Sequence, residues 1–359
     1  MLFGGQSVEH EISILSARNI YEAIDKEKFE IVLIGIDKFG GWHFSNDLIF
    51  LERDSKIHLK SFIDSSDKLA LVPGQRTDFL LPISNQDRQK RIDVVFPILH
   101  GTNGEDGSIQ GFLKLSGIPF VGAGVLGSAI GMDKDISKRL LRDAGIPIPH
   151  FHVIRRINKN SILPQKIFEE FGLPLFVKPV NLGSSVGVSK VKTIEEFTSA
   201  IDEAFLYDHK VLIEKCIIGR EIECSVLGNE NPTASVPGEI KPNYEFYSYE
   251  AKYLDENGAI LEVPAQLPSV VIKKIQETAI KTFQVLEIEG MARVDFFLQE
   301  NGELLVNEVN TIPGFTQISM YPKLWEASGL SYKDLITRLI ELALERANRD
   351  KKLKTTYEN

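Results

Sequence analysis

Two neighbouring segments near the C-terminus, MARVDFFL (291–298) and ELLVNEVNTIPG (303–314), have the character of strands and are separated by a Gly-containing turn. Side chains alternate between the two faces of a strand, so every second residue shares a face. If the strands pair as a hairpin, one surface collects Arg293, Asp295, Phe297, Glu308 and Asn310. Two carboxylates and an amide oxygen suit Mg²⁺, which takes few protein ligands and completes its shell with phosphate oxygens and water. The pattern favours nucleotide-dependent chemistry, and an ordinary solvated hairpin face is the alternative.

The composition limits the classes of partner. A length of 359 residues suggests two or three domains, and 43% apolar with 25% charged residues is typical of a globular protein. The formal net charge of -9 argues against nucleic acid or an anionic membrane as a partner, because no overall positive field collects phosphates. A local basic pocket for one nucleotide is compatible with this charge.

The two cysteines, Cys216 and Cys224, lack metal-ligand spacing and provide no disulfide framework. We therefore expect both to be reduced core thiols in a reducing compartment. No apolar run approaches the roughly 20 residues that span a bilayer, and the N-terminus has no signal-peptide pattern. Together these features predict a cytoplasmic protein.

The first third of the chain alternates strand and helix signals, which is typical of an α/β domain. Strands are expected at 29–37 and 92–99, and the near-continuous apolar run of the second suits a parallel sheet covered on both faces. Between them, roughly 44–90 is polar and is expected to be an irregular surface excursion. A loop leading into a helix follows over 104–117, and the domain is expected to end near 122.

Two further regions follow. Asp133 is a plausible N-cap, and Gly145 a plausible end, for a helix over 132–145. The other elements expected are strands over 173–180, 210–217 and 220–228, and helices over 193–206, 268–286 and 331–347.

A glycine-rich segment, GSSVG (183–187), follows the strand that carries Lys178. Glycines let backbone N–H groups approach and wrap a phosphate, and Ser184 and Ser185 add hydroxyl donors. The segment matches neither G-x-x-x-x-G-K-[ST] nor G-x-G-x-x-G, so an ordinary tight turn is the alternative.

Three polar groups, Glu214, Lys215 and Glu221, lie around a predicted strand and its turn. Carboxylates there would accept hydrogen bonds from adenine N6 or ribose hydroxyls, and a surface ion pair is the alternative.

Polar loops also follow two buried strands. His100 and Glu105 lie in HGTNGEDG (100–107), and Glu9 lies at a strand-to-helix junction. Ligands bind beyond the carboxyl ends of strands in open α/β sheets, so these side chains are placed to meet substrate. The alternatives are a structural histidine and an acid that stabilises a helix dipole.

Taken together, eight motifs of the chain resemble, in order, those of D-alanine–D-alanine ligases, which belong to the ATP-grasp superfamily. They are GGQSVEHEIS, HGTNGEDGSIQG, MDKDISKRLLRDAG, FVKPVNLGSSVGVSKV, IEK…GREIEC, YEAKY, ARVDFFL and NEVNTIPGFTQISMYP. The resemblance covers essentially the whole chain and departs from the family at the short first strand. It implies an α/β, three-domain architecture: an N-terminal parallel α/β substrate-binding domain (1–122), a small central α+β domain (123–218) and a C-terminal α+β catalytic domain (219–359).

The resemblance implies roles for individual residues. Asp295, Glu308 and Asn310 would hold two Mg²⁺ ions, for which Mn²⁺ can substitute. The residues implied in ATP binding are Lys134, Lys178, Ser185, Glu214, Lys215, Glu221, Lys252 and Phe297. Those implied in binding and joining the two D-alanines are Glu9, His100, Ser184, Tyr253, Arg293, Ser319 and Met320. Lys252 and Tyr253 belong to a lid expected over 242–260.

The implied reaction is the ATP-dependent synthesis of D-alanyl-D-alanine through an acyl phosphate, for peptidoglycan. The expected partners are small-molecule substrates and a second copy of the chain in a homodimer. Three alternatives stay open: another ATP-grasp carboxylate–amine ligase, a D-alanine–D-lactate ligase, against which Tyr253 weighs, and a catalytically silent ATP-binding regulator.

Overall fold

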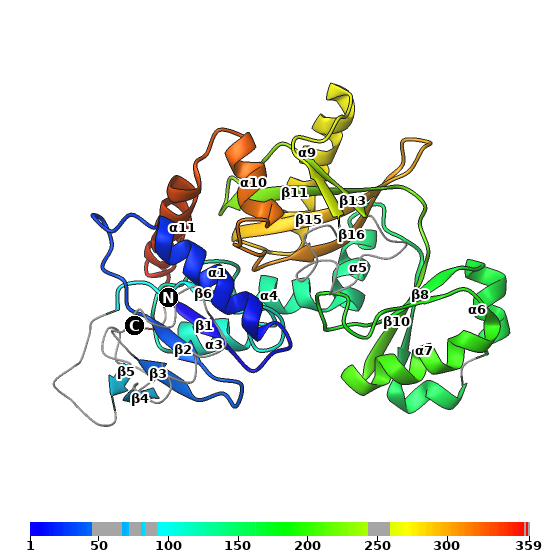
Figure 1. The fold of residues 1–359 in the computed structure, drawn as a ribbon, viewed down its shortest axis with the longest axis horizontal. Helices are drawn as coiled ribbons and strands as arrows, with labels where there is room; N and C mark the ends of the chain where they lie inside the picture. Colours follow the sequence, from blue (N-terminus) through cyan, green and yellow to red (C-terminus); the bar gives the residue numbers. More distant parts are fainter. Residues whose placement is uncertain are drawn as a thin grey trace.

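The computed structural model describes residues 1–44, 67–71, 80–82, 92–161, 163–242, 259–354 and 357. Three sheets and their helices form three lobes, with the N-terminal sheet at the lower left, the C-terminal sheet above it and a smaller central lobe at the right (Figure 1). The expected α/β class is confirmed. Among the described residues, no helix is long and apolar enough to cross a membrane.

The N-terminal sheet has the strand order β5-β4-β3-β2-β1-β6. Its strands are β1 (Leu2–Gly4), β2 (Ile34–Ile36), β3 (Trp42–Phe44), β4 (Asp67–Leu71), β5 (Leu80–Pro82) and β6 (Pro97–Ile98). The strands β2 and β6 both pair with β1 in parallel, as predicted, but they are shorter than expected. The reason is that β1 has only three residues, and a ladder is no longer than its shorter strand.

The excursion expected over 44–90 needs a correction. Its described parts include β4 and β5, which extend the sheet from β3 by antiparallel pairing. Antiparallel strands need only one covered face, so their sequences can be polar and escape a search for apolar runs.

Helices flank this sheet. They are α1 (His10–Ala23), α3 (Ser108–Leu115) and α4 (Val125–Met132), followed by α5 (Lys134–Asp143). The Asp133 side chain accepts hydrogen bonds from the backbone N–H groups of Asp135 and Ile136, which confirms it as the N-cap of α5. In Figure 1, α5 lies between the C-terminal sheet and the central lobe.

The central sheet is antiparallel, with the order β7-β10-β8-β9. Its elements are β7 (Phe151–Arg155), η3 (Arg156–Ser161), α6 (Pro164–Phe171), β8 (Leu175–Pro179), β9 (Ser189–Val191), α7 (Ile194–Tyr207) and β10 (Lys210–Lys215). The predicted strands over 173–180 and 210–217 and the helix over 193–206 are confirmed. Apolar side chains of α6 and α7 pack against this sheet in one core.

The C-terminal sheet has the order β14-β13-β11-β15-β16, and β12 pairs with β11. Its strands are β11 (Arg220–Gly228), β12 (Thr233–Ala234), β13 (Gly238–Pro242), β14 (Ala259–Glu262), β15 (Gly290–Leu298) and β16 (Leu304–Asn310), with α9 (Ser269–Val285), α10 (Met320–Ala327) and α11 (Tyr332–Asp350). Alternate residues of β11 and β15 pack with α9 in one core: Ile222, Cys224, Val226, Ala292, Val294 and Phe296. The residues between them face the other side of the sheet, where the polar groups gather.

The predicted hairpin is confirmed in register. Arg293 lies opposite Asn310, and Asp295 lies opposite Glu308. The register then shifts, so that Phe296 pairs with Val306 and Asn307 is left as the extra residue of a bulge.

The N-terminal lobe and the C-terminal helices share one core. Phe3 and Ile20 are buried in the same cluster as Phe315 and Leu339. Arg346 of α11 donates hydrogen bonds to the carbonyls of Phe120 (2.7 Å) and Gly122 (2.6 Å). Figure 1 accordingly shows α11 against α1 although they lie at opposite ends of the sequence.

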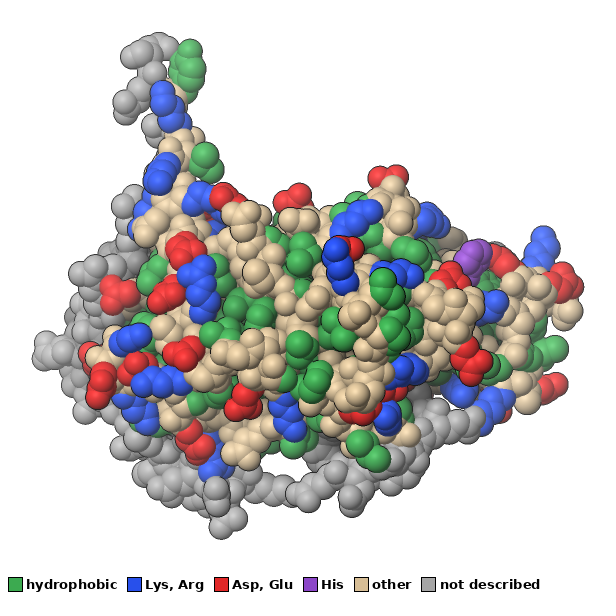
Figure 2. Space-filling model, turned by 90° about the horizontal axis from the view of Figure 1, so that it is seen from above, with side chains coloured by type: hydrophobic (Ala, Val, Ile, Leu, Met, Phe, Trp, Pro, Cys, Tyr) green, Lys and Arg blue, Asp and Glu red, His purple; other side chains and the backbone are tan. Residues whose placement is uncertain are grey.

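The surface carries both charges. On the face seen in Figure 2, the described acidic and basic side chains are interspersed rather than segregated. Mixed charges of this kind keep long-range fields weak.

Candidate active site

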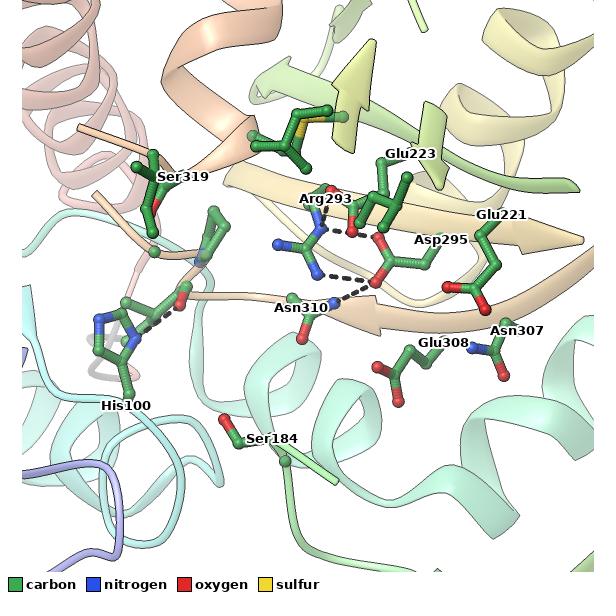
Figure 3. Close-up of a pocket in the computed structure, with 18 of the residues that line it drawn as sticks. His100, Ser184, Glu221, Glu223, Arg293, Asp295, Asn307, Glu308, Asn310 and Ser319 are labelled. Atoms are coloured by element: carbon green, nitrogen blue, oxygen red, sulfur yellow. Dashed lines mark hydrogen bonds and ion pairs between the residues drawn. The ribbon is translucent and has the colours of Figure 1, made fainter. Parts of the chain in front are cut away.

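A cavity of about 580 Å³ lies where the three lobes meet (Figure 3). The C-terminal sheet supplies one wall, the start of α1 and the loop after β6 supply another, and the glycine-rich turn closes a third. The predicted residues that line it are Glu9, His100, Glu105, Ser184, Glu221, Arg293, Asp295, Phe297, Glu308, Asn310, Ser319 and Met320. The period-two alternation of strands accounts for Glu221, Arg293, Asp295, Phe297, Glu308 and Asn310, and loops or the start of α10 supply the others.

Arg293 is held by two carboxylates. Its Nε and one terminal nitrogen donate to the two oxygens of Asp295, at 2.7 Å and 2.8 Å. Its Nε also lies 3.0 Å from Oε2 of Glu223, on the neighbouring strand β11. The guanidinium is therefore fixed in plane before any substrate binds. Sequence reasoning missed Glu223, although its period-two spacing from Glu221 was the signal that could have found it.

Asp295, Glu308 and Asn310 offer oxygen atoms of the kind that Mg²⁺ prefers. The Asn310 side-chain nitrogen donates to Asp295 at 2.9 Å, so its oxygen points away from that carboxylate (Figure 3). Within the described residues, no group of three or more His, Cys, Asp or Glu side chains could hold a metal ion. Two carboxylates and one amide are the sparse set that Mg²⁺ uses when phosphates and water complete its shell.

Lys134 lies at the edge of these ligands. Its Nζ is 3.6 Å from Oε2 of Glu308 and donates to the carbonyl of Leu182 at 2.7 Å. This lysine therefore connects the predicted metal ligands with the glycine-rich turn.

Glu9 and the glycine-rich turn meet across the cavity. The Ser184 hydroxyl donates to Oε1 of Glu9, which is only 5% exposed. On the other side, Gly101 has φ +73 and packs so closely that an added Cβ would lie 2.5 Å from Oε2 of Glu9. A side chain at position 101 would displace this carboxylate. Steric crowding therefore explains why the HGTNGEDG loop has a glycine at this position.

His100 and Glu105 bind the two backbone polar groups of one residue, Ile312. The His100 ring donates through Nδ1 to the Ile312 carbonyl (3.0 Å), and its Nε2 lies 3.1 Å from the Ser16 hydroxyl. The backbone N–H of Ile312 donates to Oε1 of Glu105 at 2.9 Å. Burial lowers the pKa of His100, whereas burial and then the charge of Glu9 raise the pKa of Glu105. Glu105 thus lies in the wall, as its loop position predicted, and helps to hold the segment that follows β16.

Ser319 precedes α10 as its N-cap residue. Its hydroxyl accepts from the backbone N–H of Thr316 at 3.0 Å. A helix N-terminus offers backbone donors to a carboxylate, which is consistent with the role implied for Ser319 and Met320.

The predicted nucleotide residues are more dispersed. Lys178 and Glu214 form a buried ion pair outside the cavity lining, and a second lysine, Lys138 of α5, reaches the same carboxylate. Sequence reasoning missed Lys138, although its spacing of four residues from Lys134 puts both on one helix face. Ser185 belongs to the turn, with φ 60, and Lys215 is exposed at the end of β10.

The expected lid falls largely outside the described residues. Lys252 and Tyr253 lie in the range 243–258, for which the structure gives no description. Their implied roles stay predictions.

Comparison with known proteins agrees with this geometry. Residues 1–123 match the family model described as the D-ala D-ala ligase N-terminus, and residues 140–341 match that of the D-ala D-ala ligase C-terminus. The chain is 56% identical to the D-alanine–D-alanine ligase of Shouchella clausii and 53% identical to that of Oceanobacillus iheyensis, covering 99% of this chain and 97% of each relative.

Two solved structures are also similar. The D-alanine–D-alanine ligase of Coxiella burnetii has a TM-score of 0.86 at 43% identity, covering 98% of this chain and 94% of that one. A D-Ala:D-Ser ligase of Enterococcus faecalis has a TM-score of 0.83 at 37% identity, covering 95% and 98%. Two family models together match most of the chain, and a relative that is 56% identical covers nearly all of it. The chain therefore belongs to the D-alanine–D-alanine ligase family of ATP-grasp enzymes.

Proposed function

We propose that this chain joins two D-alanines into D-alanyl-D-alanine with the cleavage of ATP to ADP and phosphate, for the synthesis of peptidoglycan precursors. The observation that carries the proposal is the convergence of Arg293, the Asp295–Glu308–Asn310 set and the Glu9–Ser184 contact on one cavity. Full-length similarity to ligases of this name supports the same activity.

The reaction has two steps. The carboxylate of the first D-alanine attacks the γ-phosphorus of ATP, forming an acyl phosphate as ADP leaves. The amine of the second D-alanine then attacks the activated carbonyl, and phosphate leaves. Positioning and charge neutralisation contribute most of the catalysis of such transfers.

The phosphates are assigned to Lys134, Lys178 and Lys252, with Ser185 as a donor from the turn. Asp295, Glu308 and Asn310 would hold two Mg²⁺ ions, with Mn²⁺ as a substitute, and the metal would supply positive charge against the phosphoryl oxygens. The adenosine contacts are assigned to Lys215 and Glu221, with Phe297 packed against adenine. Glu214, which the resemblance also implies there, has both carboxylate oxygens paired with lysines.

The amino acids are assigned to the opposite side of the cavity. Glu9 binds the ammonium of the first D-alanine, and His100 and Arg293 bind its carboxylate. Ser319 and the backbone of Met320 receive the carboxylate of the second. Arg293 then stabilises the tetrahedral oxyanion, because a fixed guanidinium needs no reorganisation when that charge develops.

The lid assigned to 242–260 would exclude water, which otherwise hydrolyses an acyl phosphate. In it, Tyr253 would join Ser184 and Glu9 in a hydrogen-bond network that favours an amine as the acceptor.

We also propose the division into units 1–122, 123–218 and 219–359, a homodimeric assembly and a cytoplasmic location. The three sheets support the division, since each has its own strand order.

An ADP-release assay tests the activity. D-alanine alone should sustain ADP release and dipeptide formation, whereas L-alanine should not. D-lactate and D-serine are supplied with D-alanine as competing acceptors, because one similar structure is a D-Ala:D-Ser ligase. Preferred incorporation of either acceptor, or ADP release that no amino acid stimulates, would contradict the proposal.

A further inference from the structure

A carboxylate buried in the central lobe is shared by two lysines. Oε1 of Glu214 lies 2.6 Å from Nζ of Lys138, and Oε2 pairs with Lys178. In the sheet, Lys178 lies opposite Leu212, so the side chains of Lys178 and Glu214 share a face as diagonal neighbours. The side chains of Lys138 and Glu214 are 1% and 3% exposed, whereas that of Lys178 is 12% exposed.

Lys138 also reaches the C-terminal sheet. Its Nζ donates to the carbonyl of Asn307 at 2.8 Å. Asn307 is the bulge residue that directly precedes Glu308. One buried ammonium group therefore joins α5, the central strand β10 and β16, the strand that carries two of the three predicted metal ligands.

The charges of this cluster do not balance. Two ammonium groups face one carboxylate, which leaves one positive charge in excess. Burial alone would raise the pKa of Glu214, but the charges of Lys138 and Lys178 outweigh it, so that the pKa is lowered and the carboxylate stays ionised. Burial lowers the pKa of Lys138, and the charge of Glu214 opposes this effect.

The two lysines differ in how freely their ammonium groups can move away from Glu214. Lys138 is enclosed, forms an ion pair with Glu214 and donates a hydrogen bond to the Asn307 carbonyl, whereas Lys178 is more exposed and extends from the strand that leads into the glycine-rich turn. If Lys178 turned towards a phosphate with no second cation present, Glu214 would become an unpaired buried charge, which is strongly unfavourable. With Lys138 in place, Glu214 keeps a partner throughout.

We propose that Lys138 is a positioning residue that holds Glu214 while Lys178 exchanges this carboxylate for a phosphate of the nucleotide. The inference rests on the proposed function, because it takes Lys178 as a phosphate ligand. Lys138 acts on the nucleotide only through Glu214 and touches no phosphate itself.

The measured quantity is a ratio of affinities. Competition against a fluorescent ATP analogue gives the dissociation constants of ADP and adenosine, and their ratio reports the phosphate contribution separately from the adenosine contacts. In Lys138→Met, Glu214 retains Lys178 as its cation, so the preference for ADP over adenosine should fall about 10- to 100-fold. A purely structural defect would weaken both ligands alike and leave the ratio unchanged.

A second pair of variants, made in Glu214→Gln, tests whether Lys138 acts through Glu214. In Glu214→Gln, no carboxylate retains Lys178, so adding Lys138→Met should change the ratio less than about twofold. An equal loss in both backgrounds would mean that Lys138 contacts the phosphates directly and would overturn the proposal. An unchanged ratio in folded Lys138→Met would also overturn it.

Controls cover the other outcomes. Lys273→Met removes a lysine that is 76% exposed on α9 and should leave the ratio unchanged. If Lys138→Met does not fold, Lys138→Gln replaces it, and near-ultraviolet circular dichroism monitors the packing of each variant. If the wild-type chain neither binds ADP nor forms dipeptide, the proposed function fails, whereas an active wild type with an unaltered ratio in the variants rejects only the role of Lys138.

Discussion

Two charged clusters of opposite composition flank the site. In the C-terminal sheet, one cation, Arg293, lies between the carboxylates of Asp295 and Glu223. In the central lobe, one carboxylate, Glu214, lies between two lysines. The first cluster has an excess of negative charge and the second an excess of positive charge.

The difference shows how a protein prepares for a ligand that carries many charges. A surplus carboxylate suits a metal ion, and a surplus ammonium suits a phosphate. In each cluster the surplus group is paired with an opposite charge. Four substitutions test this contrast between the two clusters and their surroundings, from the largest expected effect to the smallest.

The largest loss is expected at Glu308, the carboxylate that lies opposite Asp295 of the anionic cluster. Glu308→Gln nearly conserves shape but removes one negative charge, and a metal ion contributes several kcal/mol to charge stabilisation in the transition state. Dipeptide synthesis at saturating Mg²⁺ should fall about 10³-fold, measured as turnover.

Glu303→Gln is the matched control, because Glu303 is exposed in the turn of the same hairpin. If the turnover of Glu308→Gln were within threefold of this control, the assignment of Glu308 as a metal ligand would be wrong.

The guanidinium should matter for its shape as well as its charge. Arg293→Lys keeps the positive charge, but an ammonium cannot form the paired hydrogen bonds to Asp295 or hold a planar donor at the oxyanion. We expect turnover to fall about 10²-fold, the lower range for loss of an oxyanion donor. Arg338→Lys on α11, in an exposed pair with Glu345, serves as the control. Equal turnover in the two variants would show that charge alone suffices.

Glu105 belongs to neither cluster and should be neutralised by a proton instead. Burial and the charge of Glu9 raise the pKa of Glu105 to about 8. The folded protein therefore holds a proton that the unfolded chain releases at lower pH, so stability is highest at low pH and is lost as the pH rises through about 8.

Urea unfolding should show the wild type losing about 2 kcal/mol between pH 6 and 9 from this group. Glu105→Gln cannot ionise, so its free energy of unfolding should vary less over the same range, whatever its absolute value. If the free energies of unfolding of the two proteins changed equally with pH, the pKa of Glu105 would not be raised.

Glu223 should have the smallest effect. Glu223→Gln leaves both bonds from Arg293 to Asp295 in place and removes only the flanking charge. Turnover should fall about tenfold, because the guanidinium is then positioned from one side only. A loss as large as that of Arg293→Lys would mean that Glu223 itself contacts a ligand.

The alternation of strands explains why so much of this site was predictable. Arg293, Asp295 and Glu308 share a face through local periodicity, and the turn residues Ser184 and Ser185 follow from local backbone chemistry. These features need no knowledge of distant contacts.

The features that escaped prediction depend on distant contacts. Lys138 looks like any helical lysine until β10 places Glu214 beside it. Strands β4 and β5 gain their place from β3 rather than from apolar runs of their own. Long-range pairing of this kind leaves no periodic trace in one sequence.

The two backbone bonds of Ile312 have a mechanical consequence. His100 holds its carbonyl and Glu105 holds its N–H, and Arg346 ties α11 to the carbonyls that follow β6. This wall of the cavity is therefore braced at several points. An opening of the cavity that keeps these bonds would have to separate the central lobe from the wall, and it would break the contact between Ser184 and Glu9.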